Sequence, residues 1–310
     1  REGKLEDLTP LVILVGPNGC GKSTLLDALL IGASETPQAG VQLVRSRHTG
    51  LQNDARWLLW RGGQEAKAIV AMRQEGLGPR VCELEVIAQA KDIRCHVRPT
   101  DHTTSTPARP ARKTSPLAPA PAQESPRRVR LLDSLSEKEA HPLHQLVTLA
   151  YKRGLRREVA EQVAEIVPRM REVLILTDGN TPVVHLEFDD HTVPVSLAGD
   201  GIHALVRICL ELVCSDAGLV LIEEPEVHQH PAAIRQSVRA ILNGVRRGTQ
   251  IVLTTHSLEL IDAFLAESSE KDLESLSLYR LGLADGRLVA VRSSGTEVAF
   301  ARGDVQRDLR

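Results

Sequence analysis

The sequence has few aromatic residues: phenylalanine, tryptophan and tyrosine together make up only 2% of its 310 residues. Proteins that bind single-stranded nucleic acid stack bases on aromatic side chains, so this scarcity disfavours that mode of binding. The formal net charge is −2, and the chain as a whole therefore lacks the basic field that attracts nucleic acid. Any contact with nucleic acid would have to be local.

Paired cysteines and long apolar runs are absent as well. The cysteines form no C-x-x-C pair, and an odd, scattered set of five favours a reducing cytoplasm over a zinc site or a disulfide framework. We find no signal peptide and no apolar run of about 18 residues or more, so we expect a cytoplasmic protein without a membrane partner.

Short apolar runs and stretches of helical spacing alternate along the chain. Continuous apolar runs, typical of strands buried on both faces, stand at 11–15, 219–222 and 251–254. Apolar residues at helical spacing occupy 23–30, 201–213, 231–245 and 258–266. Shorter strands are predicted at 68–72, 81–88, 173–176, 183–188 and 193–195, and a hairpin at 276–291. The predicted fold class is α/β, with a mainly parallel core sheet, an additional antiparallel β lobe and a helical segment.

We expect one domain over residues 1–310, in four parts. Residues 1–98 would hold the first strand and the antiparallel lobe, 129–172 the helical segment, and 173–310 the remaining strands and helices. Residues 99–128 are rich in Pro, Ala, Ser, Thr and Arg and cannot bury enough apolar surface to offset their ordering entropy. We interpret them as a disordered, slightly basic insertion, which is either a solvated linker or a local contact with nucleic acid.

The strongest motif lies between the first predicted strand and the first predicted helix. Residues 16–23 read GPNGCGKS and match the phosphate-loop pattern G-x-x-x-x-G-K-[ST], known as Walker A. The glycines let backbone N–H groups curl around a phosphate, and the helix N-terminus adds partial positive charge. Lys22 would reach the β- and γ-phosphates, and Ser23 would bind Mg²⁺. Predicted nucleotide contacts are Gly16, Pro17, Asn18, Gly19, Cys20, Gly21, Lys22, Ser23 and Thr24.

Two further motifs come directly after buried strands. Glu223 and Glu224 end the strand at 219–222, and the alternation of side chains along a strand makes the two acids face different ways. Glu223 would then hold Mg²⁺ through a water molecule, and Glu224 would act as the base for the attacking water. His256 follows the strand at 251–254, where its imidazole would contact the γ-phosphate or the attacking water.

These three motifs, in this order, resemble those of the ATP-binding-cassette (ABC) ATPases, and most of all the branch that contains the RecF, SMC/Rad50 and OLD (overcoming lysogenisation defect) proteins. Strand acids in that branch often read Glu-Glu-Pro-Glu followed by a His-Pro pair, and residues 223–231 here read EEPEVHQHP. The match covers residues 1–40 and 190–265. The resemblance implies a P-loop NTPase of ABC type that hydrolyses ATP to ADP and phosphate with Mg²⁺, with Lys22, Glu224 and His256 as its catalytic residues.

The resemblance also implies a signature segment that binds the nucleotide of a partner subunit. The candidate is VSLAGDG at residues 195–201, a variant of the usual Ser-Gly-Gly-Glu. Ser196, Gly199 and Gly201 would face the partner's γ-phosphate, so that two ATP molecules are sandwiched in a head-to-tail homodimer, with residues 226–230 at the interface. A glutamine loop is implied too, and its candidates are Gln52, Gln64, Gln74 and Gln89.

Several parts found in relatives of this kind are missing. The chain has no long coiled-coil arms, and the tail after His256 lacks the clustered acids of a Toprim nuclease domain, so we expect no nuclease activity. The resemblance suggests a motor or clamp for DNA repair or anti-phage defence. One alternative is a regulatory ATPase that gates a separate effector, such as a nuclease or toxin. Another is a transporter ATPase subunit, although such subunits usually carry aspartate where Glu223 stands.

Overall fold

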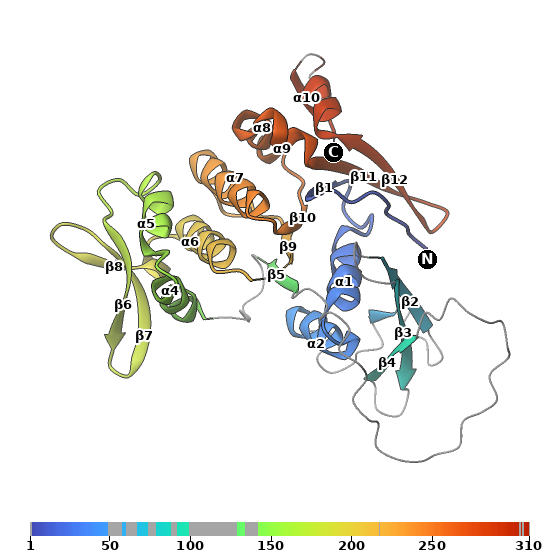
Figure 1. Ribbon diagram of the computed structural model, residues 1–310, viewed down its shortest axis with the longest axis horizontal. Helices are drawn as coiled ribbons and strands as arrows, with labels where there is room; N and C mark the ends of the chain where they lie inside the picture. The colour runs from blue at the N-terminus through green and yellow to red at the C-terminus, as the bar shows by residue number, and fades with distance from the viewer. Residues whose placement is uncertain are drawn as a thin grey trace. The chain divides into compact units, whose positions relative to one another are not determined.

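A computed structural model of the chain is drawn in Figure 1. The structure describes residues 2–48, 58–59, 67–73, 79–87, 92–98, 129–133, 142–216, 218–303, 305 and 307–309. The chain divides into two compact units, which are Arg1–Leu26 with Val129–Arg310, and Asp27–Arg128. The predicted insertion at 99–128 and all four candidates for the glutamine loop lie outside the described residues.

The first unit is built on a six-stranded sheet with the strand order β12-β11-β1-β10-β9-β5. All neighbours are parallel except the β11–β12 hairpin at the edge. The five residues of β1 are fully buried, which is why their sequence is a continuous apolar run. The strands are β1 (Leu11–Val15), β5 (Val129–Asp133), β9 (Leu219–Glu223), β10 (Gln250–Thr254), β11 (Leu276–Ala284) and β12 (Arg287–Ser294).

Three helices cover one face of this sheet and stand side by side in Figure 1. They are α6 (Asp200–Val213), α7 (Pro231–Arg246) and α8 (Leu258–Glu267). Their apolar stripes meet alternate residues of the strands, and Phe264 of α8 is the largest fully buried side chain. Each buried Leu, Ile or Phe stabilises the fold by about 1.5–3 kcal/mol. The short helix α9 (Glu270–Glu274) precedes β11, and α10 (Gly295–Gly303) follows β12.

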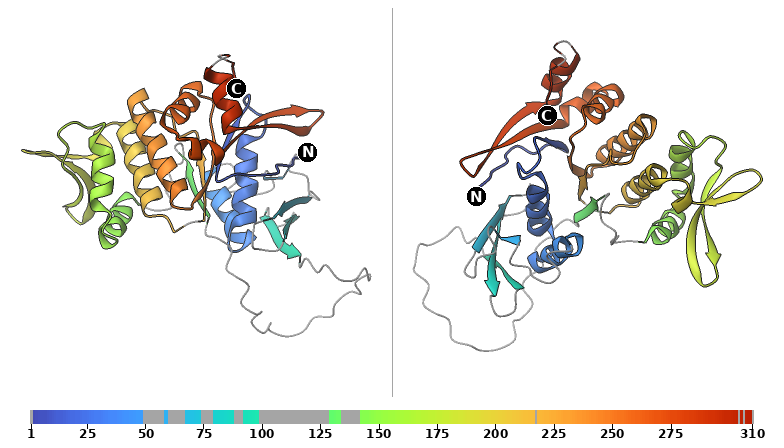
Figure 2. Two further views of the ribbon diagram at one scale, coloured as in Figure 1. Left: turned by 45° about the horizontal axis from the view of Figure 1, so that its top comes forward. Right: turned by 180° about the vertical axis from the view of Figure 1, so that it is seen from behind.

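A smaller antiparallel sheet belongs to the same unit. Its strands are β6 (Glu172–Asp178), β7 (Thr181–Glu187) and β8 (Thr192–Pro194), close to the three strands predicted there. The helices α4 (Leu143–Lys152) and α5 (Arg156–Ala164) pack on one face of it (Figure 2). The expected helical segment at 129–172 thus contains α4 and α5, but it begins with β5, a strand that we did not predict.

The second unit contains the predicted antiparallel lobe. Its strands β2 (Lys67–Met72), β3 (Arg80–Ile87) and β4 (Asp92–Arg98) form a three-stranded antiparallel sheet. The helix α1 (Lys22–Ala33) runs from the first unit into the second and is followed by α2 (Pro37–Arg47). Within the second unit the buried Arg47 Nη1 lies 2.8 Å from Asp27 Oδ1 and fastens α2 to α1. Across the described parts of both units, no helix is long and apolar enough to cross a membrane.

Candidate functional site

The predicted phosphate loop connects β1 to α1 through backbone that only glycine adopts easily. Gly16 has φ +145°, and a Cβ atom there would lie 2.4 Å from the carbonyl oxygen of Leu281 on β11. Gly19 has φ +76°, but no atom lies within 4 Å of the place where its Cβ would be. The loop is therefore tightly packed at its base and open at Gly19. Around it, Pro17, Asn18 and Thr24 are exposed, as a ligand-binding loop requires.

Lys22 folds back over this loop. Its Nζ donates hydrogen bonds to Gly16 O at 2.8 Å and to Pro17 O at 3.3 Å. Burial lowers the pKa of the Lys22 ammonium, and the nearby Cys20, Glu224 and Glu226 act in the opposite direction. The structure thus places the ammonium at the loop, within the electrostatic influence of the acids that follow β9.

Ser23 and Glu223 are brought together from elements 200 residues apart, since the Ser23 hydroxyl donates a hydrogen bond to Glu223 Oε1. Ser23 is the second residue of α1, and Glu223 ends β9, which is separated from β1 by β10 alone. Hydroxyl and carboxylate oxygens are the hard donors that Mg²⁺ prefers. The two residues predicted as metal ligands therefore fit that ion in chemistry and in position.

Glu224 and His256 also lie together, with His256 Nε2 at 3.1 Å from Glu224 Oε1. Both side chains are about one-third exposed, so solvent can reach them. Glu224 has φ +44°, a conformation that costs a non-glycine residue about 1–3 kcal/mol. The Glu224 N–H donates to Thr254 O at 3.1 Å, which helps to hold this turn at the end of β10. The predicted base and the predicted histidine thus share one end of the sheet.

Sequence reasoning placed Glu226, the last acid of Glu-Glu-Pro-Glu, at the expected dimer interface and gave it no part within its own chain's site. In the structure its Oε1 accepts hydrogen bonds from Thr255 Oγ1 at 2.5 Å and from the His256 N–H at 3.2 Å. Burial raises the pKa of Glu226, against the effect of these hydrogen bonds. The only signal in the sequence was the acid itself, three residues after Glu223.

The predicted signature segment spans the turn before α6 and the first residues of that helix. Residues Val195–Leu197 form a short 3-10 helix, and Gly199 precedes α6 with φ +101°. Ser196 is exposed, and no hydrogen bond in the described part of the chain joins Ser196 or Gly199 to the loop. Gly201 approaches the Glu-Glu region instead, because a Cβ there would lie 2.6 Å from His228 O.

The loop that Gly201 touches is held by its own side chains. Gln229 Nε2 donates to Pro225 O at 2.7 Å, and Ser237 Oγ of α7 donates to Gln229 Oε1 at 2.8 Å. His230 is the N-cap of α7, and Pro231 is its first residue. His230 Nδ1 accepts from the Ala232 N–H at 3.3 Å, so the His-Pro pair acts as a helix start.

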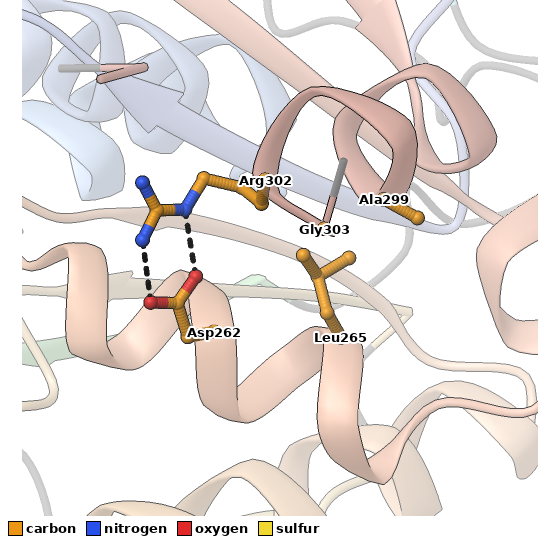
Figure 3. Close-up of a pocket in the computed structure, with 5 residues that line it drawn as sticks. All are labelled: Asp262, Leu265, Ala299, Arg302 and Gly303. Carbon is orange, nitrogen blue, oxygen red and sulfur yellow. Dashed lines mark hydrogen bonds and ion pairs between the residues drawn. The ribbon is translucent and has the colours of Figure 1, made fainter. Parts of the chain in front are cut away.

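A separate pocket lies between α8 and α10 (Figure 3). Arg302 pairs with Asp262 there through two hydrogen bonds of 2.7 and 2.6 Å, and both residues line the pocket. The other lining residues are Leu265, Ala299 and Gly303. None of these residues belongs to the predicted nucleotide site, and we interpret the ion pair as a link between the two helices.

Two sequence comparisons place the chain among known proteins. The family model described as "AAA domain, putative AbiEii toxin, Type IV TA system" matches residues 11–71 and 119–262. A protein of Methanocaldococcus jannaschii named as uncharacterized is 32% identical over 114 residues, which are 36% of this chain and 98% of that protein. The family match includes the phosphate loop, the acids after β9 and His256.

Solved structures agree on the fold. An SMC head bound to the C-winged helix domain of ScpA is similar with a TM-score of 0.55 at 12% identity, covering 93% of this chain and 92% of that one. An Smc head domain with an extended coiled coil, derived from Pyrococcus furiosus and bound to the C-terminal domain of ScpA, has a TM-score of 0.54 at 10% identity, with 96% and 93% covered. These likenesses confirm the predicted ABC-type P-loop fold with a mainly parallel sheet.

Proposed function

Because the chain belongs to the family described as "AAA domain, putative AbiEii toxin, Type IV TA system", and is a P-loop ATPase, we propose that it hydrolyses ATP with Mg²⁺ between two copies of itself. The convergence of Lys22, the Ser23–Glu223 pair and the Glu224–His256 pair at one end of the parallel strands carries this proposal. The carboxyl ends of parallel strands are where α/β folds bind ligands.

The phosphate loop binds the triphosphate through its backbone N–H groups and the start of α1. Lys22 moves from its carbonyl partners in the loop to the phosphate oxygens, which are stronger acceptors for an ammonium. Ser23 and Glu223 would hold Mg²⁺, which would supply positive charge to neutralise the phosphates. Ser23 and Glu223 must exchange their mutual hydrogen bond for this role, and their geometry keeps both oxygens at one place.

Glu224 takes the proton of the attacking water. Its carboxylate is partly exposed at the end of β9, where a water can reach it, and His256 Nε2 lies 3.1 Å away. The His256 imidazole orients the Glu224 carboxylate and also contacts the γ-phosphate, so it responds to whether that phosphate is present. General-base catalysis of this kind contributes about 10²–10⁴-fold to a rate.

The second half of the site comes from a partner copy. Ser196 lies in the 3-10 helix before α6, Gly199 is the N-cap of α6 and Gly201 is its second residue, so a hydroxyl, open backbone and a helix N-terminus that suit a phosphate follow one another. The exposed position of Ser196 leaves it accessible to a second chain. A head-to-tail homodimer would bring each signature segment to the other chain's phosphate loop and close two ATP sites.

The ATPase cycle drives a motor or clamp in DNA repair or anti-phage defence, as in the RecF/SMC/OLD-like branch. The order of residues 223–231, EEPEVHQHP, supports that branch. A second candidate is a regulatory ATPase that gates a separate effector. The family description includes a putative toxin of a Type IV TA system, so such a system is one setting in which to search for that effector. We expect the nucleotide-bound dimer to be the species that engages either partner.

Solution mass with and without ATP tests the proposal for wild type, Glu224→Gln and the control Glu274→Gln, which alters an exposed acid of α9. We expect Glu224→Gln to bind ATP, to accumulate as a dimer, and to lose turnover by about a hundredfold or more. Glu274→Gln should match wild type in all three. A Glu224→Gln protein that binds ATP but stays monomeric would refute the two-copy site, and normal turnover would refute the base.

The trapped dimer then separates the two roles. Binding to duplex DNA whose affinity falls steeply as salt rises from about 50 to 200 mM would support the clamp, because contacts to DNA phosphates release counterions. Absence of binding at the lower salt concentration would support the regulatory role and direct the search to a protein effector.

A further inference from the structure

The segment that carries His256 is hydrogen-bonded to β1 and to the turn after β9. The Thr255 N–H donates to Leu14 O of β1 at 3.0 Å, which continues the pairing of β10 beyond its last residue. The next two donors of the segment, the Thr255 hydroxyl and the His256 N–H, both go to Glu226 Oε1. A single carboxylate oxygen therefore accepts both a side-chain donor and a backbone donor of the segment that carries His256.

The same hydroxyl organises the start of the following helix. Thr255 Oγ1 accepts from the Ser257 N–H at 2.9 Å, and Ser257 is the N-cap of α8, where its Oγ accepts from the Leu260 N–H at 3.2 Å. The Thr255 hydroxyl stands between the carboxylate on one side and the helix start on the other. Any shift of Glu226 would thus move the backbone from Thr255 to Ser257.

Glu226 is also rigidly connected to Glu224. One turn, closed by a hydrogen bond from the Val227 N–H to Glu224 O at 3.1 Å, contains Glu226, and a second turn begins at Glu226 with the bond from the Gln229 N–H to Glu226 O at 3.0 Å. Glu224 is in turn bonded to Thr254 through its own N–H. The turn after β9 is thus joined to the end of β10 through Glu224 and to the segment after β10 through both Glu224 and Glu226.

We propose that Glu226 is a positioning residue for hydrolysis, whose carboxylate holds the His256 segment in register with the Glu224 side chain. The proposal rests on the proposed roles of Glu224 and His256. The Glu226 side chain suits this task because a carboxyl oxygen has lone pairs for two donors at once. Its Oε1 accepts from Thr255 Oγ1 at 2.5 Å and from the His256 N–H at 3.2 Å.

The second oxygen of the Glu226 carboxylate indicates that this side chain does more than fill space. Glu226 Oε2 is buried and has no hydrogen-bond partner among the residues that the structure describes. A buried acceptor without a partner lowers stability, so an acid is a costly choice for a position that only had to fill space. This cost is explained if Glu226 Oε1 has to accept hydrogen bonds from two donors at once.

The test is a set of matched substitutions assayed for turnover, ATP affinity and thermal stability. Glu226→Ala removes the acceptor, whereas Glu226→Gln keeps an acceptor oxygen without the charge. Thr255→Val removes the donor, and Thr255→Ser keeps it. Because misplacing a catalytic group by about 1 Å costs up to a hundredfold, we expect kcat to fall about ten- to a hundredfold in Glu226→Ala and Thr255→Val. Glu226→Gln and Thr255→Ser should keep most of the rate, and ATP affinity should change little in all four.

The link to His256 is tested in a second background. If Glu226 acts through His256, then Glu226→Ala should lower kcat by less than about twofold in a chain that already carries His256→Ala. Independent, multiplying losses would overturn the proposal, as would a Glu226→Gln protein that is folded and as slow as Glu226→Ala. Thr255→Val supplies the same comparison if Glu226→Ala does not fold.

Failure of the proposed function is distinguishable from failure of this inference. A His256→Ala protein with normal turnover would refute the role of His256 itself, whatever the Glu226 variants do. A slow His256→Ala protein together with a normal Glu226→Ala protein would leave the proposed function in place and refute the positioning role.

Discussion

The phosphate-loop part and the signature part of the predicted site differ in how completely one chain builds them. Lys22, Glu223 and Glu224 lie in a set of hydrogen bonds and ion pairs that connects β1, β9 and β10. In the signature segment Ser196 is exposed, and the neighbouring Leu197 is 76% exposed. This difference is what the proposed two-copy site requires, with one half preorganised within the chain and the other half presented to a second chain.

Removing Lys22 should have the largest effect on the preorganised half. Lys22→Ala deletes the ammonium that would neutralise the phosphates, and we expect ATP turnover to fall by more than about a hundredfold. Equilibrium binding of a fluorescent ATP analogue should be lost with it. The exposed Lys271 of α9 provides the matched control, and Lys271→Ala should bind as wild type does. Tight analogue binding by Lys22→Ala would contradict the assigned role.

The base and the mouth of the phosphate loop should respond differently to the same substitution. Gly16→Ala places a methyl group 2.4 Å from a backbone oxygen, and we expect a loss of about 3 kcal/mol or more in unfolding free energy. Gly19→Ala meets no atom within 4 Å and pays only for its positive φ, about 1–2 kcal/mol. Urea unfolding of both variants measures the difference, and equal losses would show that the base of the loop is not packed as described.

The ion pair between Arg246 and Asp272 lies outside both halves of the site and should affect stability without affecting turnover. Arg246 donates to Asp272 at 3.0 and 2.7 Å, and these bonds, with those from Ser269, hold the pKa of Asp272 well below its usual range. Asp272→Asn should lower the unfolding free energy at pH 7 by about 2 kcal/mol. Turnover per folded molecule should not change.

The pH dependence of that loss has a definite sign. Because the folded-state pKa of Asp272 is depressed, its contribution is complete above the unfolded-state value of about 3.9 and is lost as pH falls below it. Urea unfolding at pH 7 and at pH 3 should therefore show a smaller difference between wild type and Asp272→Asn at pH 3. A difference that grows on acidification would contradict the ion pair.

Of these variants, Ser196→Ala should have the smallest effect on the unfolding free energy, and it tests the signature half of the site directly. Its unfolding free energy should stay within about 0.5 kcal/mol of wild type, because Ser196 is an exposed surface residue. Turnover should fall roughly tenfold, the loss of one charge-assisted hydrogen bond.

Mixing Ser196→Ala with Lys22→Ala tests whether the two halves come from different chains. A mixed dimer contains one site with an intact loop from one chain and an intact signature from the other. The mixture should therefore be more active than either variant alone. A mixture no more active than the Ser196→Ala component would show that each site is built from one chain.

Much of the fold was predictable because local patterns and tertiary positions agree. The runs in β1, β9 and β10 are continuous because both faces of these strands are covered, and the predicted α6, α7 and α8 begin within one residue of their bounds. The strand β5 escaped prediction because VRLLD at residues 129–133 is short and mixed. Its identity as a strand depends on pairing with β9 at the edge of the sheet.

The sequence by itself determined the phosphate loop, the acids after β9 and the histidine after β10, because each motif is local and directly follows its strand. Only the tertiary structure decided which of them meet. The Ser23–Glu223 contact and the Glu226–Thr255 contact depend on β1, β10 and β9 being neighbours in that order. Strand order is set by the crossover helices and by burial of the whole sheet, so residues far apart in sequence become partners only when that sheet has formed.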